Sequence, residues 1–392
     1  MRGRLQGVLA VLVALVAVAG VVVGCAAAGA TPPVPGAPSA DAPPSVTTTA
    51  AAGRTDVDPG GEISVSAPDA ALRDVALTGA DGRGVAGTTS PDGHRWTADE
   101  ALGYGRSYTW SGSAVGADGA VTPIAGGFTT VTPDRVVRAQ FAQPDDATVG
   151  VAAPIVIQFD GPVTDKAAAE RALSIRTSVP TEGSWAWLPD DADGSRVHWR
   201  PKEYWQPGTV VDVRADLYGV ALGDGAYGRE DLTSHLTVGR SQIVRADVGS
   251  HRMVVIRDGQ QVMDVPASYG LGSDPNRITR SGTHVVTEKF DNKRMTSAQY
   301  GYDLIEHWAV RISNNGEFIH ANPASASAQG SSNVTHGCVN LSTADARAYY
   351  DTALYGDPVE VTGSPVQLSA ADGDVYDWAI GWDQWRGMSA LS

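Results

Sequence analysis

Cysteine is almost absent from this chain. Only Cys25 and Cys338 occur among 392 residues, and their sequence contexts differ so much that we expect no disulfide between them. Basic residues are also scarce, with 29 Lys and Arg against 44 Asp and Glu and a net charge of −15. With no basic stripe, this balance argues against binding to nucleic acid or to an anionic membrane surface. Aromatic residues make up only 7%, whereas glycine (45) and proline (23) are plentiful, which favours short strands and turns over long helices.

The first 25 residues have the features of a targeting segment. Arg2 and Arg4 precede an almost unbroken run of Val, Ala and Leu over residues 8–23, which is somewhat short for a membrane-spanning helix. Gly24-Cys25 at its end resembles a bacterial lipobox, in which the cysteine is lipidated and becomes the new N-terminus. We therefore predict a signal peptide over residues 1–25, lipid attachment at Cys25, and a protein that is extracytoplasmic and touches the membrane only through this anchor. A plain signal peptide and an uncleaved anchor are the alternatives.

Residues 26–54 are rich in Ala, Pro, Thr and Ser and contain no aromatic residue. Such a segment buries too little apolar surface to offset the entropy lost on ordering, so we predict a disordered tether. Fully extended as polyproline II, it would reach on the order of 90 Å.

Two β-rich segments follow, at residues 55–135 and 136–240. Strand-like runs such as Ile155-Val156-Ile157-Gln158-Phe159 alternate with turns such as Asp81-Gly82. A faint repeat relates Asp92-Gly93-His94-Arg95-Trp96 to Asp193-Gly194-Ser195-Arg196 and the nearby Trp199. The copies are about a hundred residues apart, which predicts two immunoglobulin-like sandwiches in tandem, with one larger β domain as the alternative. Neither segment holds a catalytic constellation, so we expect them to act as spacers.

The third segment, residues 241–363, begins with a hairpin whose turn is Asp258-Gly259. After further strands, Ser342-Thr343-Ala344-Asp345 resembles a capping box that starts a helix running to about Leu354. The last segment, residues 364–392, holds Trp378, Trp382 and Trp385. An exposed cluster of that kind is unfavourable. We expect this tail to pack on the body of the protein, with a glycan-stacking surface as the alternative.

The residues around Cys338 suggest thiol chemistry. His336 and Gly337 directly precede this cysteine, and His320 lies upstream at the end of a predicted strand. A free thiol is mostly protonated at neutral pH, but an adjacent imidazole can take its proton or stabilise the thiolate. We expect Cys338 just before a helix, whose free N–H groups would hold an oxyanion. This pattern fits acyl transfer through a thioester, whereas a buried structural cysteine and a strand-end structural histidine are the alternatives.

A known family shares these residues. His320 and the run Thr335-His336-Gly337-Cys338-Val339-Asn340 resemble the signature of the YkuD-type L,D-transpeptidases, and Gly282-Thr283, Tyr302 before Trp308, and Asn315-Gly316 also match. The tandem sandwiches and Trp-rich tail resemble the actinobacterial members, so the resemblance covers nearly the whole mature chain. It implies a mainly β fold, with two immunoglobulin-like sandwiches followed by a β-rich catalytic domain with one or two short helices.

The resemblance also implies a reaction. Cys338 would attack the carbonyl between meso-diaminopimelate and the terminal D-Ala of a peptidoglycan stem tetrapeptide. D-Ala would leave, and an amine of an acceptor stem would resolve the thioester to give a 3→3 cross-link. Carbapenem β-lactams would acylate Cys338, and no cofactor is expected. The protein would face the cell wall.

Individual roles follow from the same resemblance. His320 would be the general base and acid, oriented through its other ring nitrogen by the main-chain carbonyl near Ala321. Tyr302 and the N–H groups around Gly337 and Cys338 would hold the oxyanion or the substrate carbonyl. The stem peptide would contact Asn340, Asn315 and Gly316, and a mobile lid would span about residues 290–302. His336 could be catalytic or a structural donor, and the sequence leaves this open.

Three alternatives to a transpeptidase remain at this point. An L,D-carboxypeptidase would use the same acyl-enzyme but transfer it to water. A zinc site could include His320, His336, Cys338 and His307, although the Cys-x-x-Cys and His-Glu-x-x-His patterns typical of such sites are missing. A non-catalytic lipoprotein that binds the wall is the third.

Overall fold

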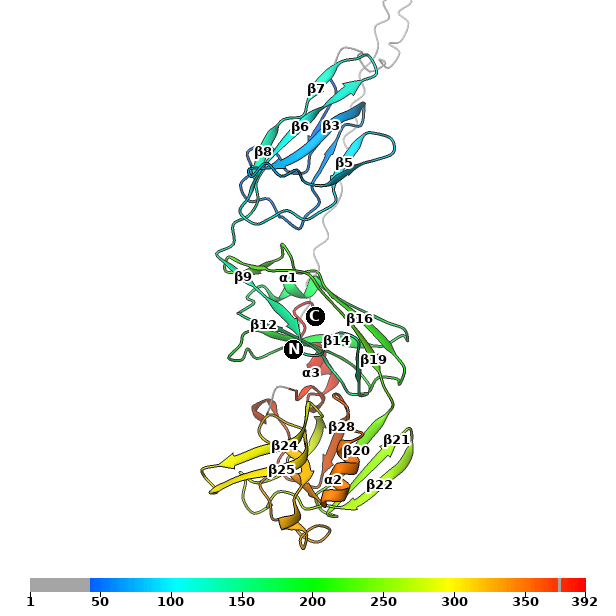
Figure 1. Ribbon diagram of the computed structural model, residues 1–392, viewed down its shortest axis with the longest axis vertical. Coiled ribbons are helices and arrows are strands. Elements are labelled where there is room, and N and C mark those ends of the chain that lie inside the picture. The colour runs from blue at the N-terminus through cyan, green and yellow to red at the C-terminus, as the bar shows by residue number, and fades with distance from the viewer. Residues whose placement is uncertain (1–42, 373–374) are drawn as a thin grey trace, which may run out of the picture. The chain divides into compact units, whose positions relative to one another are not determined.

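The computed structural model describes residues 43–372 and 375–392 (Figure 1). The predicted signal peptide, the lipidation site Cys25 and most of the predicted tether lie outside the described residues. Within the described ranges, no helix is both long and apolar enough to cross a membrane.

The first domain is a sandwich of two sheets around a core that includes Val65, Leu77 and Trp110. In spatial order, one sheet holds β1 (Thr47–Thr48), β2 (Ser64–Ser66), β5 (Arg95–Ala98) and β4 (Gly87–Thr89). The other sheet holds β3 (Ala70–Gly79), β6 (Ser107–Gly116) and β7 (Val121–Pro123), with β8 (Gly126–Thr129) also paired to β6.

The start of this sandwich corrects the predicted end of the tether. Thr47 pairs with Ser66 across the first sheet, Ala50 is only 1% exposed, and the carbonyl of Pro44 accepts a hydrogen bond from Thr122 at 2.9 Å. The ordered domain therefore begins near Pro44 rather than at Thr55. The low aromatic content that predicted disorder was misleading, because a short edge strand needs only backbone pairing and one small buried side chain.

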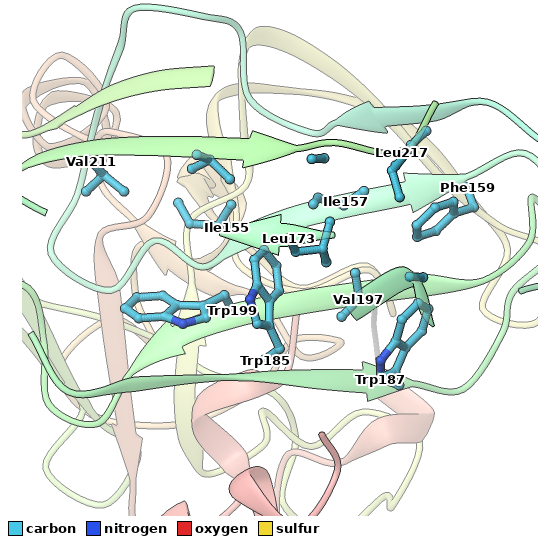
Figure 2. Close-up of a cluster of buried hydrophobic side chains, with 14 of the residues drawn as sticks. Ile155, Ile157, Phe159, Leu173, Trp185, Trp187, Val197, Trp199, Val211 and Leu217 are labelled. Atoms are coloured by element: carbon cyan, nitrogen blue, oxygen red, sulfur yellow. The ribbon is translucent and has the colours of Figure 1, made fainter. Parts of the chain in front are cut away.

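The second domain is another two-layered sandwich. One sheet holds β10 (Ala139–Phe141), β12 (Ile155–Phe159), β15 (Arg196–Pro201) and β14 (Gly183–Leu188), and the other holds β11 (Ala147–Val149), β19 (Leu232–Val238), β16 (Val210–Ala215) and β13 (Leu173–Thr177). A small third sheet consists of β17 (Ala221–Gly223), β18 (Ala226–Gly228) and β9 (Arg135–Val137). Figure 2 shows Trp185, Trp187 and Trp199 in the core of this sandwich, together with Ile155 and Ile157.

The faint sequence repeat corresponds to a shared packing feature. A Cβ atom added to Gly87 on β4 would lie 1.9 Å from Cζ2 of Trp96 on the paired strand β5. A Cβ atom added to Gly183 on β14 would lie 1.9 Å from Cζ2 of Trp199 on the paired strand β15. In each sandwich an indole therefore covers a strand glycine, which explains why the two tryptophans occupy matching places in the repeat.

The catalytic domain has two sheets and one main helix. The first sheet has the order β22 (Gln260–Pro266), β21 (Arg252–Arg257), β20 (Gln242–Asp247), β28 (Pro358–Thr362) and β23 (Gly282–Val285). The second has the order β24 (Glu288–Ser297), β25 (Tyr302–Arg311), β26 (Phe318–Ala321) and β27 (Val339–Leu341), and α2 (Thr343–Tyr350) packs on β25 and β26. Figure 1 labels β20, β21, β22, β28, β24, β25 and α2. A short 3-10 turn, η1 (Pro323–Ser325), follows β26.

Local signals in this domain gave both correct and incorrect boundaries. The predicted hairpin turn is confirmed, because Asp258 and Gly259 both have positive φ, +48° and +79°, as a type I′ turn requires. Ser342 is confirmed as the N-cap, since its Oγ accepts from the Asp345 N–H at 3.1 Å, whereas the Asp345 carboxylate accepts from Ser342 Oγ at 2.6 Å rather than from the backbone N–H of a full capping box. However, α2 ends at Tyr350 rather than near Leu354.

The Trp-rich tail lies against the second sandwich. It forms η2 (Ala370–Asp372), η3 (Asp377–Ala379) and α3 (Trp382–Arg386). Trp385 is completely buried and its Nε1–H donates to the Ser184 carbonyl on β14 at 2.9 Å. The Arg200 guanidinium on β15 lies 4.5, 5.3 and 4.9 Å from the ring centroids of Trp378, Trp382 and Trp385. Because Trp385 is engaged in these contacts, it is unavailable for stacking on a glycan.

Candidate active site

Cys338 lies at the junction of a tight turn and a central strand. The preceding Gly337 has φ +111°, a conformation that only glycine adopts readily. Strand β27 follows directly and runs parallel to β26, with His320 in register with Asn340. The prediction that a helix follows Cys338 is therefore wrong, because Val339–Leu341 is a fully buried strand and α2 begins only at Thr343. The N–H groups of the turn at Gly337 and Cys338, rather than a helix end, are the candidate oxyanion donors.

The Cys338 thiol has two polar neighbours. Its Sγ donates to the Gly316 carbonyl oxygen at 3.5 Å, and it shares the cavity with His320 and contributes to raising the pKa of that imidazole. His320 is 3% exposed, and its Nδ1 lies 2.9 Å from the Ala321 carbonyl oxygen. The predicted contact between this histidine and the main chain near Ala321 is therefore confirmed. Since Nδ1 is occupied, Nε2 is the nitrogen available to the thiol.

The surroundings of His320 favour its charged form. Burial alone would lower the pKa of His320, but hydrogen bonds and negative charge from Cys338 and Glu306 outweigh it and raise this pKa to about 10. An imidazolium at this position stabilises a thiolate, which is the nucleophilic form of cysteine. The arrangement can therefore generate a reactive Cys338 by moving one proton to His320.

His336 has a different environment from His320. Its ring centroid lies 4.6 Å from that of Tyr300 and 5.2 Å from that of Tyr302. Burial and the nearby Arg277 lower its pKa, so the ring is neutral at physiological pH. Packing between two tyrosines favours the structural one of its two predicted roles.

A cavity of about 320 Å³ opens onto Cys338. It is lined by Met295, Tyr300, Tyr302, Leu304, Glu306, His320, Asn322, Ala324, Ser325, Val334, Thr335, His336, Cys338 and Asn340. Burial and Cys338 raise the pKa of Tyr302, so its phenol stays protonated and can donate a hydrogen bond into the cavity. The predicted lid is the end of the β24–β25 hairpin, and Met295 and Leu304 face the cavity from its two strands.

The sequence analysis missed several residues of this wall, among them Leu304 and Glu306. An available signal was the alternation of strand residues. Once Tyr302 is placed in the site, Leu304 and Glu306 follow on the same face of β25.

Asn340 stabilises the turn at Gly337 and Cys338 through hydrogen bonds of its side-chain amide. Its Nδ2 lies 2.7 Å from both the Cys338 carbonyl and Thr335 Oγ1, and 3.0 Å from the Ser268 carbonyl. Its Oδ1 accepts from Asn322 Nδ2 at 2.9 Å, and the residue is 1% exposed. These contacts give Asn340 a bracing role, and because it also lines the cavity, its contact with the stem peptide stays a prediction.

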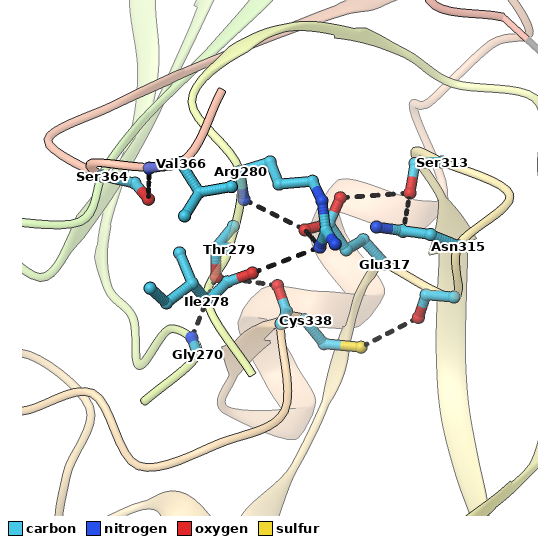
Figure 3. A network of polar contacts seen from close by, with 12 residues as sticks. Gly270, Ile278, Thr279, Arg280, Ser313, Asn315, Glu317, Cys338, Ser364 and Val366 are labelled. Atoms are coloured by element: carbon cyan, nitrogen blue, oxygen red, sulfur yellow. Dashed lines mark hydrogen bonds and ion pairs between the residues drawn. The ribbon is translucent and has the colours of Figure 1, made fainter. Parts of the chain in front are cut away.

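A polar network supports the two backbone segments that lie next to the Cys338 thiol (Figure 3). Glu317 is 2% exposed and accepts hydrogen bonds from the Arg280 N–H at 3.0 Å and from Ser313 Oγ at 3.1 Å. Ser313 Oγ also contacts Asn315 Oδ1. On the other side, Thr279 Oγ1 donates to the Gly337 carbonyl at 2.8 Å. These contacts fix the loop of Gly316 and the turn of Gly337, which are the two backbone segments around the thiol.

Asn315 and Gly316 are exposed near this network. Gly316 approaches the thiol through its carbonyl, so both residues border the site, but neither lines the cavity. As for the zinc alternative, the described part of the chain contains no group of three or more His, Cys, Asp or Glu side chains that could hold a metal ion.

Comparison with known proteins finds two family matches within this chain. Residues 241–361 match the YkuD family, the L,D-transpeptidase catalytic domain, and residues 54–221 match a bacterial Ig domain family. L,D-transpeptidase 5 of Mycobacterium tuberculosis is 57% identical over 337 residues, covering 86% of this chain and 75% of that protein. The chain belongs to the L,D-transpeptidase family. It is therefore an acyltransferase with an immunoglobulin-like region ahead of its catalytic domain.

Two further relatives of this transpeptidase were found. L,D-transpeptidase 2 of M. tuberculosis is 38% identical over 356 residues, covering 88% of this chain and 85% of that protein. A solved structure of LdtMt1, an L,D-transpeptidase in complex with imipenem, is 35% identical with a TM-score of 0.49, covering 59% of this chain and all of the other.

Proposed function

We propose that this transpeptidase forms 3→3 cross-links between meso-diaminopimelate residues of peptidoglycan stems through a thioester on Cys338. The observation that carries the proposal is that Cys338 and His320 line one cavity, with Nδ1 of His320 held by the Ala321 carbonyl at 2.9 Å. Family membership supports the reaction class.

The acylation half of the reaction uses this pair as follows. The thiol proton moves from Sγ to Nε2 of His320, and the thiolate attacks the carbonyl between diaminopimelate and D-Ala. The N–H groups of Gly337 and Cys338, with the Tyr302 hydroxyl, stabilise the oxyanion that forms. His320 then gives the proton to the leaving amine, and D-Ala departs.

Deacylation runs through the same two residues. The amine of an acceptor stem enters the cavity, attacks the thioester and transfers a proton to His320 Nε2. The thiolate of Cys338 leaves and regains this proton. Met295 and Leu304 on the hairpin line the cavity, and these apolar side chains would limit access of water to the thioester and favour the amine as acceptor.

Inhibition by carbapenems follows from the same nucleophile. Attack of the Cys338 thiolate on the β-lactam carbonyl would break the ring C–N bond, and the nitrogen would take the proton from His320. Because this nitrogen stays covalently attached to the acyl group, no fragment would leave and the adduct would persist on Cys338. The proposal also includes the location of the enzyme, namely extracytoplasmic, facing the wall, and attached to the membrane by lipid on Cys25. Metabolic labelling with a lipid analogue, compared between wild type and Cys25→Ala, tests that anchor.

Incubation with a disaccharide-tetrapeptide tests the main proposal. We expect release of D-Ala and formation of a cross-linked dimer, and we expect neither from Cys338→Ala. Release of D-Ala without any dimer would instead identify an L,D-carboxypeptidase. Equal D-Ala release from wild type and Cys338→Ala would show that the nucleophile is wrongly assigned.

A further inference from the structure

Glu306 is a nearly buried carboxylate beside the catalytic histidine. Its side chain is 13% exposed, and its Oε2 lies 3.6 Å from Nδ1 of His320. It also lines the cavity that opens onto Cys338. The reaction described above assigns no role to this charge, although a buried carboxylate is unfavourable unless a cation or donor compensates it.

An irregularity in the sheet brings Glu306 to this position. His307 pairs with Ala321 and Val310 pairs with Ile319, so Trp308 and Ala309 together lie opposite the single residue His320. Trp308 has φ +53°, a strained conformation for a bulky residue that marks a β-bulge. Because bulges change the direction in which neighbouring side chains point, this one determines which residue of β25 faces His320.

The Ala321 carbonyl and the Glu306 carboxylate lie at different distances from Nδ1 of His320 and interact with it differently. The Ala321 carbonyl at 2.9 Å takes the hydrogen bond, whereas the Glu306 oxygen at 3.6 Å is too distant for a second strong one. At this distance the carboxylate acts through its charge, and low exposure weakens screening by water. The other titratable groups of the cavity wall are Tyr300, Tyr302, His336 and Cys338, and Lys293 lies opposite Glu306 on β24.

We propose that Glu306 is a positioning residue that stabilises the imidazolium form of His320 while Cys338 is a thiolate. This inference rests on the proposed function, in which Nε2 receives the thiol proton. Glu306 remains an ionised carboxylate throughout and accepts no proton, so each proton still passes only between Sγ, Nε2 and the amine. The carboxylate favours the charge-separated pair over neutral thiol and imidazole, and it keeps His320 protonated as the acid for the leaving amine.

The test replaces Glu306 by glutamine, which keeps shape and removes charge. An opposite charge within 4–6 Å typically shifts a pKa by about 1–3 units. In Glu306→Gln we therefore expect the alkaline limb of kcat/KM for D-Ala release to move down by at least about one pH unit. Asp303→Asn is the matched control, because it removes one charge from the same strand at an exposed ion pair with Arg294. An unchanged alkaline limb in Glu306→Gln would overturn the inference.

A second measurement is independent of turnover. Titration of ¹⁵N-labelled His320 by NMR reports its imidazolium directly, and we expect Glu306→Gln to titrate at lower pH than wild type and Asp303→Asn. Glu306→Asp keeps the charge, so its His320 should titrate close to the wild-type pH. If Glu306 had a merely structural role, Glu306→Gln would leave the pH at which His320 titrates unchanged. If wild type releases no D-Ala, the proposed function fails, but the titration still supports or refutes the role of Glu306.

Discussion

Substitution of Gly337 by alanine tests whether the backbone of the nucleophile turn needs glycine. A Cβ atom there would find its nearest neighbour, Glu317 Cγ, at an ordinary contact distance of 3.5 Å. The cost of Gly337→Ala therefore comes from φ +111° rather than from a clash. Backbone strain of this kind costs about 1–3 kcal/mol.

This strain can appear in two measurable ways. If the turn keeps its geometry, the free energy of unfolding falls by about 1–3 kcal/mol in a urea titration. If the turn relaxes, Cys338 and its N–H group move, and the same energy appears as a loss of about 10–100-fold in D-Ala release. Gly272→Ala is the matched control, because Gly272 is not in the positive-φ region and has nothing within 4 Å of its added Cβ. Unchanged stability together with unchanged activity in Gly337→Ala would refute the reasoning.

Two further predictions concern stability. Trp385 is fully buried between α3 and β14, so Trp385→Ala should lower the free energy of unfolding by about 3–5 kcal/mol in urea, and a loss below about 1 kcal/mol would contradict this packing. The pKa of His320 is raised from 6.5 to about 10 in the folded protein, so the stability it contributes is complete below pH 6.5 and is lost as pH rises through about 10. Urea titrations over this range should therefore show the difference in stability between wild type and His320→Gln shrinking with rising pH, and growth with pH would contradict the account.

Local sequence signals predicted most of the architecture. The apolar run at residues 155–159 predicted β12, and Asp258-Gly259 predicted the β21–β22 hairpin, because strand propensity and turn chemistry act over a few residues. Helix α1 (Lys166–Arg171) was missed. Its six residues are too few for a periodic signal. The start of this helix is fixed by the Asp165 side chain, which accepts a hydrogen bond from the Ala168 N–H at 2.9 Å.

The sequence predicted those residues of the candidate site that lie close to Cys338 along the chain. The motif identified Cys338 and His320, and the family resemblance implied the contact of His320 with the main chain near Ala321. Alternation from Tyr302 indicates the face of β25 on which Glu306 lies, but its position beside His320 depends on the long-range pairing of β25 with β26 and on the bulge at Trp308. The bracing bonds of Asn340 to Ser268 and Thr335 could not be predicted either, because they arise only in the folded domain.

Intact-mass spectrometry of the acyl-enzyme tests the central claim most directly. Wild-type protein mixed with a donor tetrapeptide stem, without acceptor, should gain the mass of the donor minus D-Ala, and peptide mapping should place it on Cys338. Cys338→Ala should show no added mass. An adduct that persists on Cys338→Ala, or one that maps to another residue of the wild type, would contradict the assignment of Cys338 as the nucleophile.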